Sequence, residues 1–198
     1  MKKSIIVLVS FLLLLSCSNK VEDPSEDIKN ESLMEARGYP DNSSTKFGKI
    51  GLWIEAKSAI IDWGDGIKDE VYLNGSGSNI EHFYNNANYQ KVKIYASELK
   101  KINFNKDGLY YEVDIKKAPF LTHFVGDKDM RKIEFDYIPN IIHFDIENGK
   151  FDESDLNSIF NNLPTVDAGV IRIGGNPGRI NCKTAIAINK GWDVKISI

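Results

Sequence analysis

The chain has 198 residues, with 25 lysines and arginines against 28 aspartates and glutamates, which gives a formal net charge of −3 at pH 7. No basic stripe with interleaved aromatic residues runs along it, so nucleic acid is excluded as a partner. The part beyond the leader is long enough for one domain or two small ones with a hydrophobic core.

The first sixteen residues predict export. In "MKKSIIVLVSFLLLLS" two lysines precede an apolar run, which is the pattern of a signal peptide. The run is about half of the roughly 20 apolar residues that a transmembrane helix needs, so a permanent span is not expected. We therefore assign residues 1–16 to a signal peptide that is removed.

The next residues, "LLSC" from Leu14 to Cys17, resemble the lipobox of bacterial lipoproteins, although Leu15 is larger than the residue usual there. The resemblance implies that Cys17 is lipidated and becomes the first residue of the mature chain. Several acyl chains on one residue would anchor the protein without a span. Ser18 rather than an aspartate after the cysteine implies, by analogy with lipoprotein sorting, the outer membrane, on its surface or its periplasmic face.

Residues 17–45 are polar and poor in apolar side chains, and we predict a flexible tether there. A strand, turn and strand are predicted next, because apolar residues alternate with polar ones up to the break at "GDG". Three carboxylates, Asp62, Asp65 and Asp69, lie around this break. A structural turn is the favoured interpretation, since short aspartate side chains bond to nearby backbone amides. The alternative is a calcium site, which would need six to eight oxygen ligands.

Residues 46–97 resemble the polycystic-kidney-disease (PKD) repeat, a small β-sandwich of extracellular proteins. The resemblance rests on the sequence "WGDG" from Trp63, on His82-x-Tyr84, and on the run from Tyr89 to Ile94. Asn88 stands where the family usually has a glycine, and the segment is short. The resemblance implies a PKD-like β cap rather than a complete sandwich.

An internal repeat follows in residues 98–150. "VDIKKAPFLTHF" from Val113 matches "IEFDYIPNIIHF" from Ile133 at an offset of 20 residues, with His123 aligned on His143. Such a period predicts short parallel strands, each burying its apolar residues against its neighbours. The predicted inward positions form one continuous core: Ile102, Val113, Ile115, Phe124, Ile133, Phe135, Phe144 and Ile146.

Residues 151–198 are predicted to close the repeat with a helix and a strand. Leu156, Ile159, Phe160 and Leu163 have helical spacing. A second helix starting near Cys182 would bury that thiol as a packing group and end at Gly191, with Trp192 returning to the core.

This last segment resembles the C-terminal end of short leucine-rich-repeat lipoproteins of Gram-negative anaerobes. The resemblance rests on "NPG" from Asn176, on Cys182 and on the pair Gly191-Trp192. It implies a fold that is mainly β with short helices, in which a PKD-like cap is followed by a short leucine-rich-repeat solenoid and a C-terminal helix/strand cap. Members of the family supply no catalytic residues to carry over.

The repeat places polar residues on two strand faces. We predict a candidate binding face made by Lys101, Asn103, His123, His143 and Asp145. The two histidines could hold a metal with Asp145, but spacing fixes no third ligand, so a solvated face is the favoured interpretation. The second face is acidic and carries Glu112, Asp114, Lys132 and Glu134.

The sequence contains no nucleophile elbow, zinc-protease helix or phosphate loop, and it implies no cofactor. It therefore predicts a non-catalytic, lipid-anchored module that binds an extracellular or periplasmic partner, either a protein or a glycan. A protein is slightly favoured, because most aromatic residues fall at predicted core positions. The alternatives are a glycan-processing hydrolase that uses the acidic face, and a purely structural surface lipoprotein.

Overall fold

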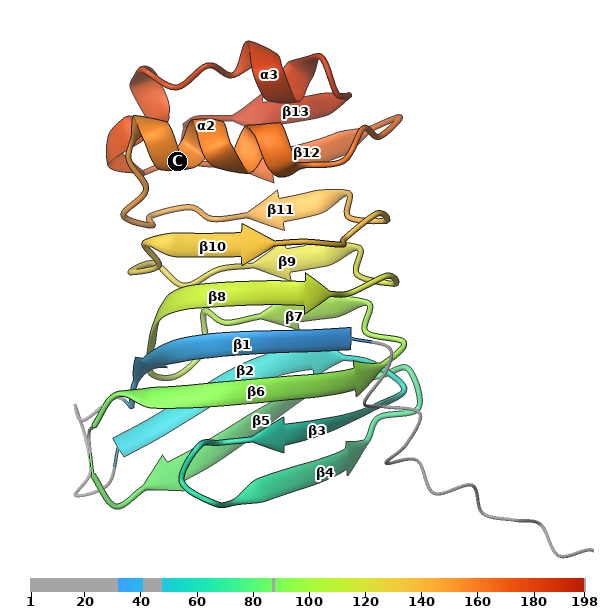
Figure 1. The fold of residues 1–198 in the computed structure, drawn as a ribbon, viewed down its shortest axis with the longest axis vertical. Helices are drawn as coiled ribbons and strands as arrows, with labels where there is room; N and C mark the ends of the chain where they lie inside the picture. The colour runs from blue at the N-terminus through green and yellow to red at the C-terminus, as the bar shows by residue number, and fades with distance from the viewer. Residues whose placement is uncertain (1–31, 41–47, 87, 198) are drawn as a thin grey trace, which may run out of the picture.

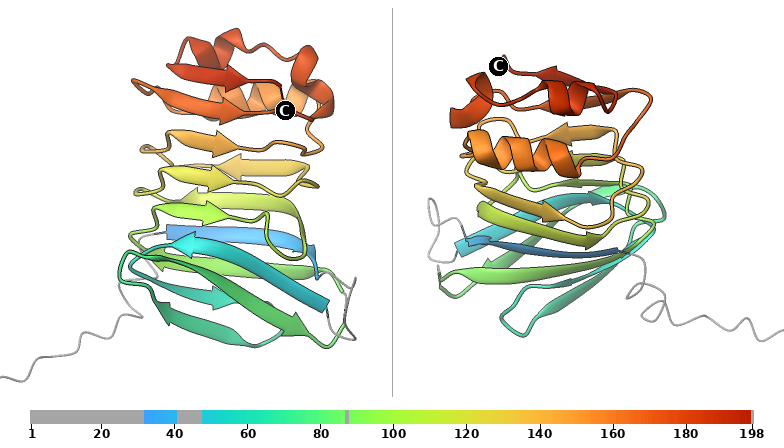
Figure 2. Two further views of the ribbon diagram at one scale, coloured as in Figure 1. Left: turned by 180° about the vertical axis from the view of Figure 1, so that it is seen from behind. Right: turned by 45° about the horizontal axis from the view of Figure 1, so that its top comes forward.

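The computed structural model describes residues 32–40, 48–86 and 88–197, and these form a mainly β protein with two mixed sheets and few helices. Figure 1 views the six-stranded sheet from its outer face, with the seven-stranded sheet behind it, and Figure 2 shows the reverse side. The predicted signal peptide and the predicted lipidation site, Cys17, lie outside the described residues. No helix in the described ranges is long and apolar enough to cross a membrane.

The six-stranded sheet has the order β10-β8-β1-β6-β3-β4. All neighbouring pairs are antiparallel except β8 and β10, which are parallel. The strands are β1 (Ser32–Tyr39), β3 (Ser58–Asp62), β4 (Lys68–Tyr72), β6 (Gln90–Ser97), β8 (Leu109–Lys117) and β10 (Lys132–Phe135).

The seven-stranded sheet has the order β13-β12-β11-β9-β7-β2-β5. Antiparallel pairing joins β2 to β5 and to β7, and every pair from β7 to β13 is parallel. The strands are β2 (Gly48–Glu55), β5 (Gly77–Tyr84), β7 (Lys101–Asn103), β9 (His123–Val125), β11 (His143–Asp145), β12 (Gly169–Arg172) and β13 (Trp192–Lys195).

The 20-residue offset in the sequence corresponds to one step along the seven-stranded sheet. His123 pairs with His143, and Phe124 pairs with Phe144, in parallel register. The two phenylalanine rings stack with centroids 5.0 Å apart. All the predicted inward residues are buried within one hydrophobic cluster, so the predicted core is confirmed.

The helix predicted after residue 151 is confirmed as α2 (Glu153–Asn162), which begins with a capping box formed by Asp152 and Asp155. It buries Leu156, Ile159 and Phe160 and packs beside β10 (Figure 1). Because α2 occupies the place of a further strand at this edge, the six-stranded sheet ends at β10, whereas the opposite sheet continues through β12 and β13.

The C-terminal helix is shorter than predicted. It spans only α3 (Ala185–Ile188), and Cys182 precedes it, after the 3₁₀-helix η1 (Pro177–Ile180). The thiol is nevertheless buried and free, as predicted for a packing group, and burial raises its pKa. Gly191 adopts a positive φ of 88°, and Trp192 is buried, as expected.

The side chain of Asn176 forms hydrogen bonds with backbone groups on both sides of α2. Asn176 is fully buried, and its Nδ2 donates to the backbone oxygens of Ile146 at 2.7 Å and Ile173 at 3.0 Å. Its Oδ1 accepts a hydrogen bond from the Phe151 backbone nitrogen at 3.2 Å. These bonds connect the turns that follow β11 and β12 to the segment just before α2.

The predicted tether over residues 17–45 is wrong for residues 32–39, which form β1 at the centre of the six-stranded sheet. Its alternating inward residues are Ser32, Met34, Ala36 and Gly38, of which only Met34 is large and apolar. The composition therefore looked polar, although every second residue is buried.

The boundary predicted between residues 97 and 98 divides neither sheet. β1 joins β6 to β8, and β2 joins β5 to β7, so strands from both sides of that boundary are hydrogen-bonded together. A single hydrophobic cluster runs through both parts. The region around β2 to β6 and the region around β7 to β11 therefore share one core.

Candidate binding site

The structure gathers the predicted binding face on three adjacent parallel strands. Lys101 and Asn103 lie on β7, His123 on β9, and His143 and Asp145 on β11. The imidazole rings stack with centroids 5.3 Å apart and an interplanar angle of 21°. These five side chains therefore lie close together, as predicted, on the outer side of the seven-stranded sheet.

Several side chains of this face are engaged in local contacts. Lys101 forms an ion pair with Glu55 at 3.0 Å, and Asp145 accepts a bond from the backbone nitrogen of Glu147 at 3.0 Å. Burial lowers the pKa of His123, and the adjacent His143 lowers it further. In the described ranges no group of three or more His, Cys, Asp or Glu side chains is placed to hold a metal ion.

The three carboxylates of the "GDG" loop each have a different protein partner. Asp62 accepts from the Gly64 backbone nitrogen and forms an ion pair with Lys68 at 3.1 Å. Asp65 accepts from the Ile67 backbone nitrogen at 3.0 Å and lies 2.8 Å from His82 Nε2.

The third carboxylate, Asp69, accepts a bond of 2.7 Å from Trp63 Nε1. The tryptophan ring in turn stacks on His82, with centroids 5.1 Å apart. The three carboxylates thus stabilise a turn and do not converge on one point, which supports the structural interpretation of this loop.

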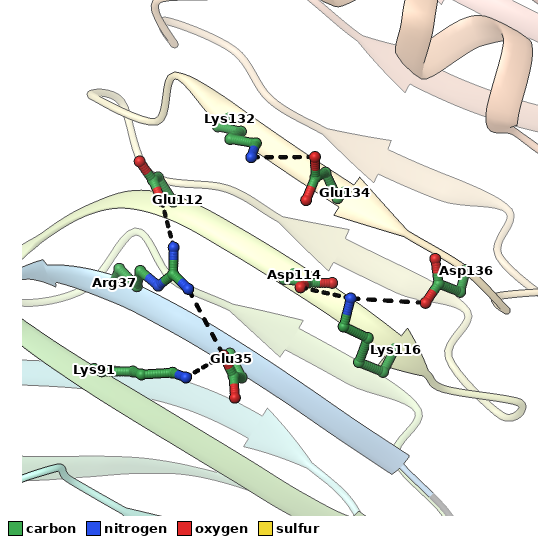
Figure 3. A network of polar contacts seen from close by, with 9 residues as sticks. All are labelled: Glu35, Arg37, Lys91, Glu112, Asp114, Lys116, Lys132, Glu134 and Asp136. Carbon is green, nitrogen blue, oxygen red and sulfur yellow. Dashed lines mark hydrogen bonds and ion pairs between the residues drawn. The ribbon is translucent and has the colours of Figure 1, made fainter.

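The outer face of the six-stranded sheet holds a second cluster (Figure 3), part of which the sequence did not predict. Asp114 on β8 pairs in register with Glu35 on β1 and with Glu134 on β10. Neighbouring strands in a sheet lie about 4.8 Å apart, so three carboxylates form one row across three strands. Like charges directly opposite one another destabilise a sheet, and cations must offset this row.

Cations from the same strands and from β6 supply that compensation. Lys91 approaches Glu35 at 2.7 Å, Lys116 approaches Asp114 at 2.8 Å, and Lys132 approaches Glu134 at 3.1 Å. Exposed ion pairs contribute little to stability, so these pairs chiefly fix side-chain positions. The remaining members of this charged network are Arg37, which donates to Glu112 at 3.0 Å, and Asp136.

Within this network lies an open hollow of about 160 Å³. A pocket that encloses a drug-sized ligand measures about 300 to 1,000 Å³, so this hollow would hold only part of a ligand. The residues that line it are Glu35, Arg37, Glu112, Val113, Asp114, Lys132 and Glu134.

A second hollow of about 220 Å³ adjoins the first, since Glu112 lines both. The register of β1 against β8 shifts between Arg37 and Gly38, and both Tyr111 and Glu112 remain partly exposed while Tyr110 is buried. The second hollow is lined by Tyr39, Tyr89, Tyr111, Glu112 and Arg131, and we call it the tyrosine hollow.

The aromatic rings of the tyrosine hollow contact one another edge to face. Tyr39 lies 5.2 Å from Tyr89 and 5.7 Å from Tyr111, measured between ring centroids. Tyr39 and Tyr89 remain 42% and 45% exposed, so both can receive a ligand. Burial raises the pKa of Tyr89, and the nearby Glu112 adds to this effect.

Sequence reasoning predicted the acids on β8 and β10 but missed the remainder of this surface. Glu35, Arg37 and Tyr39 fall within the predicted tether, and Tyr89 enters only through the resemblance to the PKD repeat. The alternation of "SLMEARGY" was the one available signal, because its charged residues and its tyrosine fall on one face of a strand.

Comparison with protein-family models, with curated proteins and with solved structures finds no match for this chain. The function proposed below is therefore based on the geometry of the two sheet faces.

Proposed function

We propose that the protein is a lipid-anchored, non-catalytic module of the cell envelope that binds an extracellular or periplasmic partner, a protein or a glycan. The observation that carries the proposal is the pair of adjoining hollows on the outer face of the six-stranded sheet. They combine exposed tyrosines with arginines, the residue types that dominate binding energy in protein interfaces. The stacked histidines on the opposite sheet are a secondary candidate surface.

A glycan is the partner that this surface favours. The sequence favoured a protein only because aromatic residues seemed confined to the core, whereas Tyr39 and Tyr89 are exposed beside a hollow. The face of an aromatic ring carries partial negative charge and attracts the C–H bonds of a sugar ring. Arginine and carboxylate side chains around the rings would bond to sugar hydroxyls.

We also infer a relationship to leucine-rich-repeat surface lipoproteins with a PKD-like β cap. Parallel pairing from β7 to β13 and the 20-residue step between β9 and β11 support a short solenoid. The antiparallel strands before residue 98, which include the Trp63 loop, would then be the cap. Surfaces of repeat proteins commonly bind partners, which agrees with the proposed function.

A hydrolase that uses the acidic face of Glu112, Asp114 and Glu134 is the competing function, and the ion pairs of these acids argue against it. Asp114 lies 2.8 Å from Lys116, and Glu112 accepts a hydrogen bond of 3.0 Å from Arg37. Glu134 lies 3.1 Å from Lys132. Turnover of any glycoside or peptide that vanished in Glu134→Gln would nevertheless establish the hydrolase.

The binding proposal predicts that the double variant Tyr39→Ala/Tyr89→Ala loses its ligand. Glycan arrays and capture of cell-envelope proteins should detect binding by the wild-type chain and reduce it at least about tenfold in the variant, since the aromatic contact area is lost. Both tyrosines are partly exposed, so the fold should persist in circular dichroism. Tyr72→Ala is the matched control, because Tyr72 is 62% exposed on the same sheet but lines neither hollow.

Equal loss in the Tyr72→Ala control would show that a general surface effect is responsible. Binding that survived in the double variant would place the site elsewhere. Absence of any ligand, together with silence in hydrolase assays, would favour a purely structural surface lipoprotein.

The anchor is tested separately by Cys17→Ala. We expect the wild-type protein to fractionate with membranes, in the outer membrane, and the variant to be released, because lipid chains on Cys17 would provide the attachment. The measurement is membrane fractionation followed by immunoblotting. A variant that stayed bound to membranes would contradict the lipid anchor.

A further inference from the structure

We propose that the tyrosine hollow recognises a glycan that carries a carboxylate, such as a uronic or sialic acid, and that Arg131 bonds to this group. This inference rests on the proposed function, because it assumes that the same surface binds a glycan. It specifies that the ligand is negatively charged and that Arg131 binds the charged group.

The placement of Arg131 is the first argument. Its guanidinium lies over the ring of Tyr111, 4.3 Å from the ring centroid. Stacking on an aromatic face holds the guanidinium plane while leaving its edge N–H groups available as donors. Those donors form a fork that matches the two oxygens of a carboxylate.

The second argument is the balance of charge. Glu112, which also lines the hollow, accepts a hydrogen bond of 3.0 Å from Arg37, and this pair is neutral as a whole. Within the described part of the chain Arg131 forms no ion pair. The adjoining network (Figure 3) holds five acids against four bases, so the surface as a whole is not positive, but the guanidinium of Arg131 is the cation in the hollow that is left available to an anionic group.

The third argument is that Arg131 lies close to the exposed tyrosine rings. Tyr39 contacts both Tyr89 and Tyr111, and Arg131 lies on Tyr111, so the cation and the exposed rings are neighbours. A uronic or sialic acid carries its carboxylate directly on the sugar ring. One such unit could place its ring against Tyr39 or Tyr89 and its carboxylate on Arg131.

The hollow is open and measures about 220 Å³, so it fits a sugar unit resting on the surface and not an enclosed ligand. A neutral glycan would gain the aromatic contacts and could bond to Arg131 only through uncharged hydroxyl groups. The acidic glycan gains a charge-assisted hydrogen bond in addition, which favours it over its neutral counterpart.

The test compares matched sugars on the full-length protein in detergent micelles. The probes are galacturonate, glucuronate and sialylated oligosaccharides, each measured beside its carboxyl-reduced neutral form by isothermal titration calorimetry. We expect the wild-type chain to bind at least one acidic form about tenfold or more tightly than its reduced form, the range that a charge-assisted hydrogen bond supplies.

Arg131→Gln should remove this preference, so that the acidic form and its reduced form bind with affinities within about twofold of each other. Arg172→Gln is the control, since Arg172 is an exposed arginine on β12 of the opposite sheet. Circular dichroism of both variants confirms that the fold is retained.

The outcomes separate this inference from the proposed function. An acidic preference that survives in Arg131→Gln overturns the inference. So does binding of neutral forms alone, or of a protein alone, through Tyr39 and Tyr89, although the proposed function would then stand. If no sugar and no protein binds, both are overturned.

Discussion

A chain that begins at residue 46 should fail to fold, whereas one that begins at residue 31 should fold like the full-length protein. The difference is β1 (Ser32–Tyr39), which lies between β6 and β8 in the centre of the six-stranded sheet (Figure 1). Its removal leaves the facing edges of both neighbours without hydrogen-bond partners and opens the core where Met34 and Ala36 are fully buried.

The size of this effect follows from the strand pairing that β1 provides. Its residues from Ser32 to Gly38 pair with β6, and those from Leu33 to Tyr39 pair with β8. Each buried backbone group left unpaired costs about 1 to 3 kcal/mol. The summed cost of many unpaired groups would exceed the free energy of unfolding of a typical domain, which is about 5 to 15 kcal/mol.

Far-UV circular dichroism and thermal melting of the two truncated chains measure the difference. The chain from residue 31 is the control, because it removes only what precedes the strand. A cooperative melt of the chain from residue 46 at the temperature of the control would show that β1 is dispensable and that a tether was the correct interpretation.

Phe144→Ala should lower the free energy of unfolding by about 3 to 5 kcal/mol, the usual cost of removing a buried phenylalanine. Phe144 is fully buried, and its ring stacks on Phe124 at 5.0 Å and lies 5.7 Å from Phe135. It therefore contacts side chains from both sheets, and the substitution would open a cavity between them. Chemical denaturation measures the change.

Ile142→Ala is the matched control for this substitution. Ile142 is two residues away but 43% exposed, so we expect a change within about 0.5 kcal/mol, as for most surface substitutions. If Phe144→Ala changed stability no more than the control, the parallel register of β9 and β11 would be wrong.

The sequence alone determined the register of β9 against β11. The 20-residue offset aligned His123 with His143 and Phe124 with Phe144, and the structure pairs the same residues. The reason is physical: short strands that stack in parallel must repeat their inward residues at the same positions, so this order is written into the sequence as a period. The first C-terminal helix was predictable for a similar reason, since its apolar residues recur at helical spacing.

Only the tertiary structure revealed β1 and the hollows beside it. The strand turns Ser32, Ala36 and Gly38 inward, and such small residues give little apolar signal. Arg37 meets Glu112 across 75 residues of sequence, and Lys91 reaches Glu35 from another strand. Antiparallel pairing between distant strands follows no period, and the register shift beside Arg37 has no mark in the sequence. The position of the site was therefore decided by strand order and register, which arise only when the two sheets close over their common core.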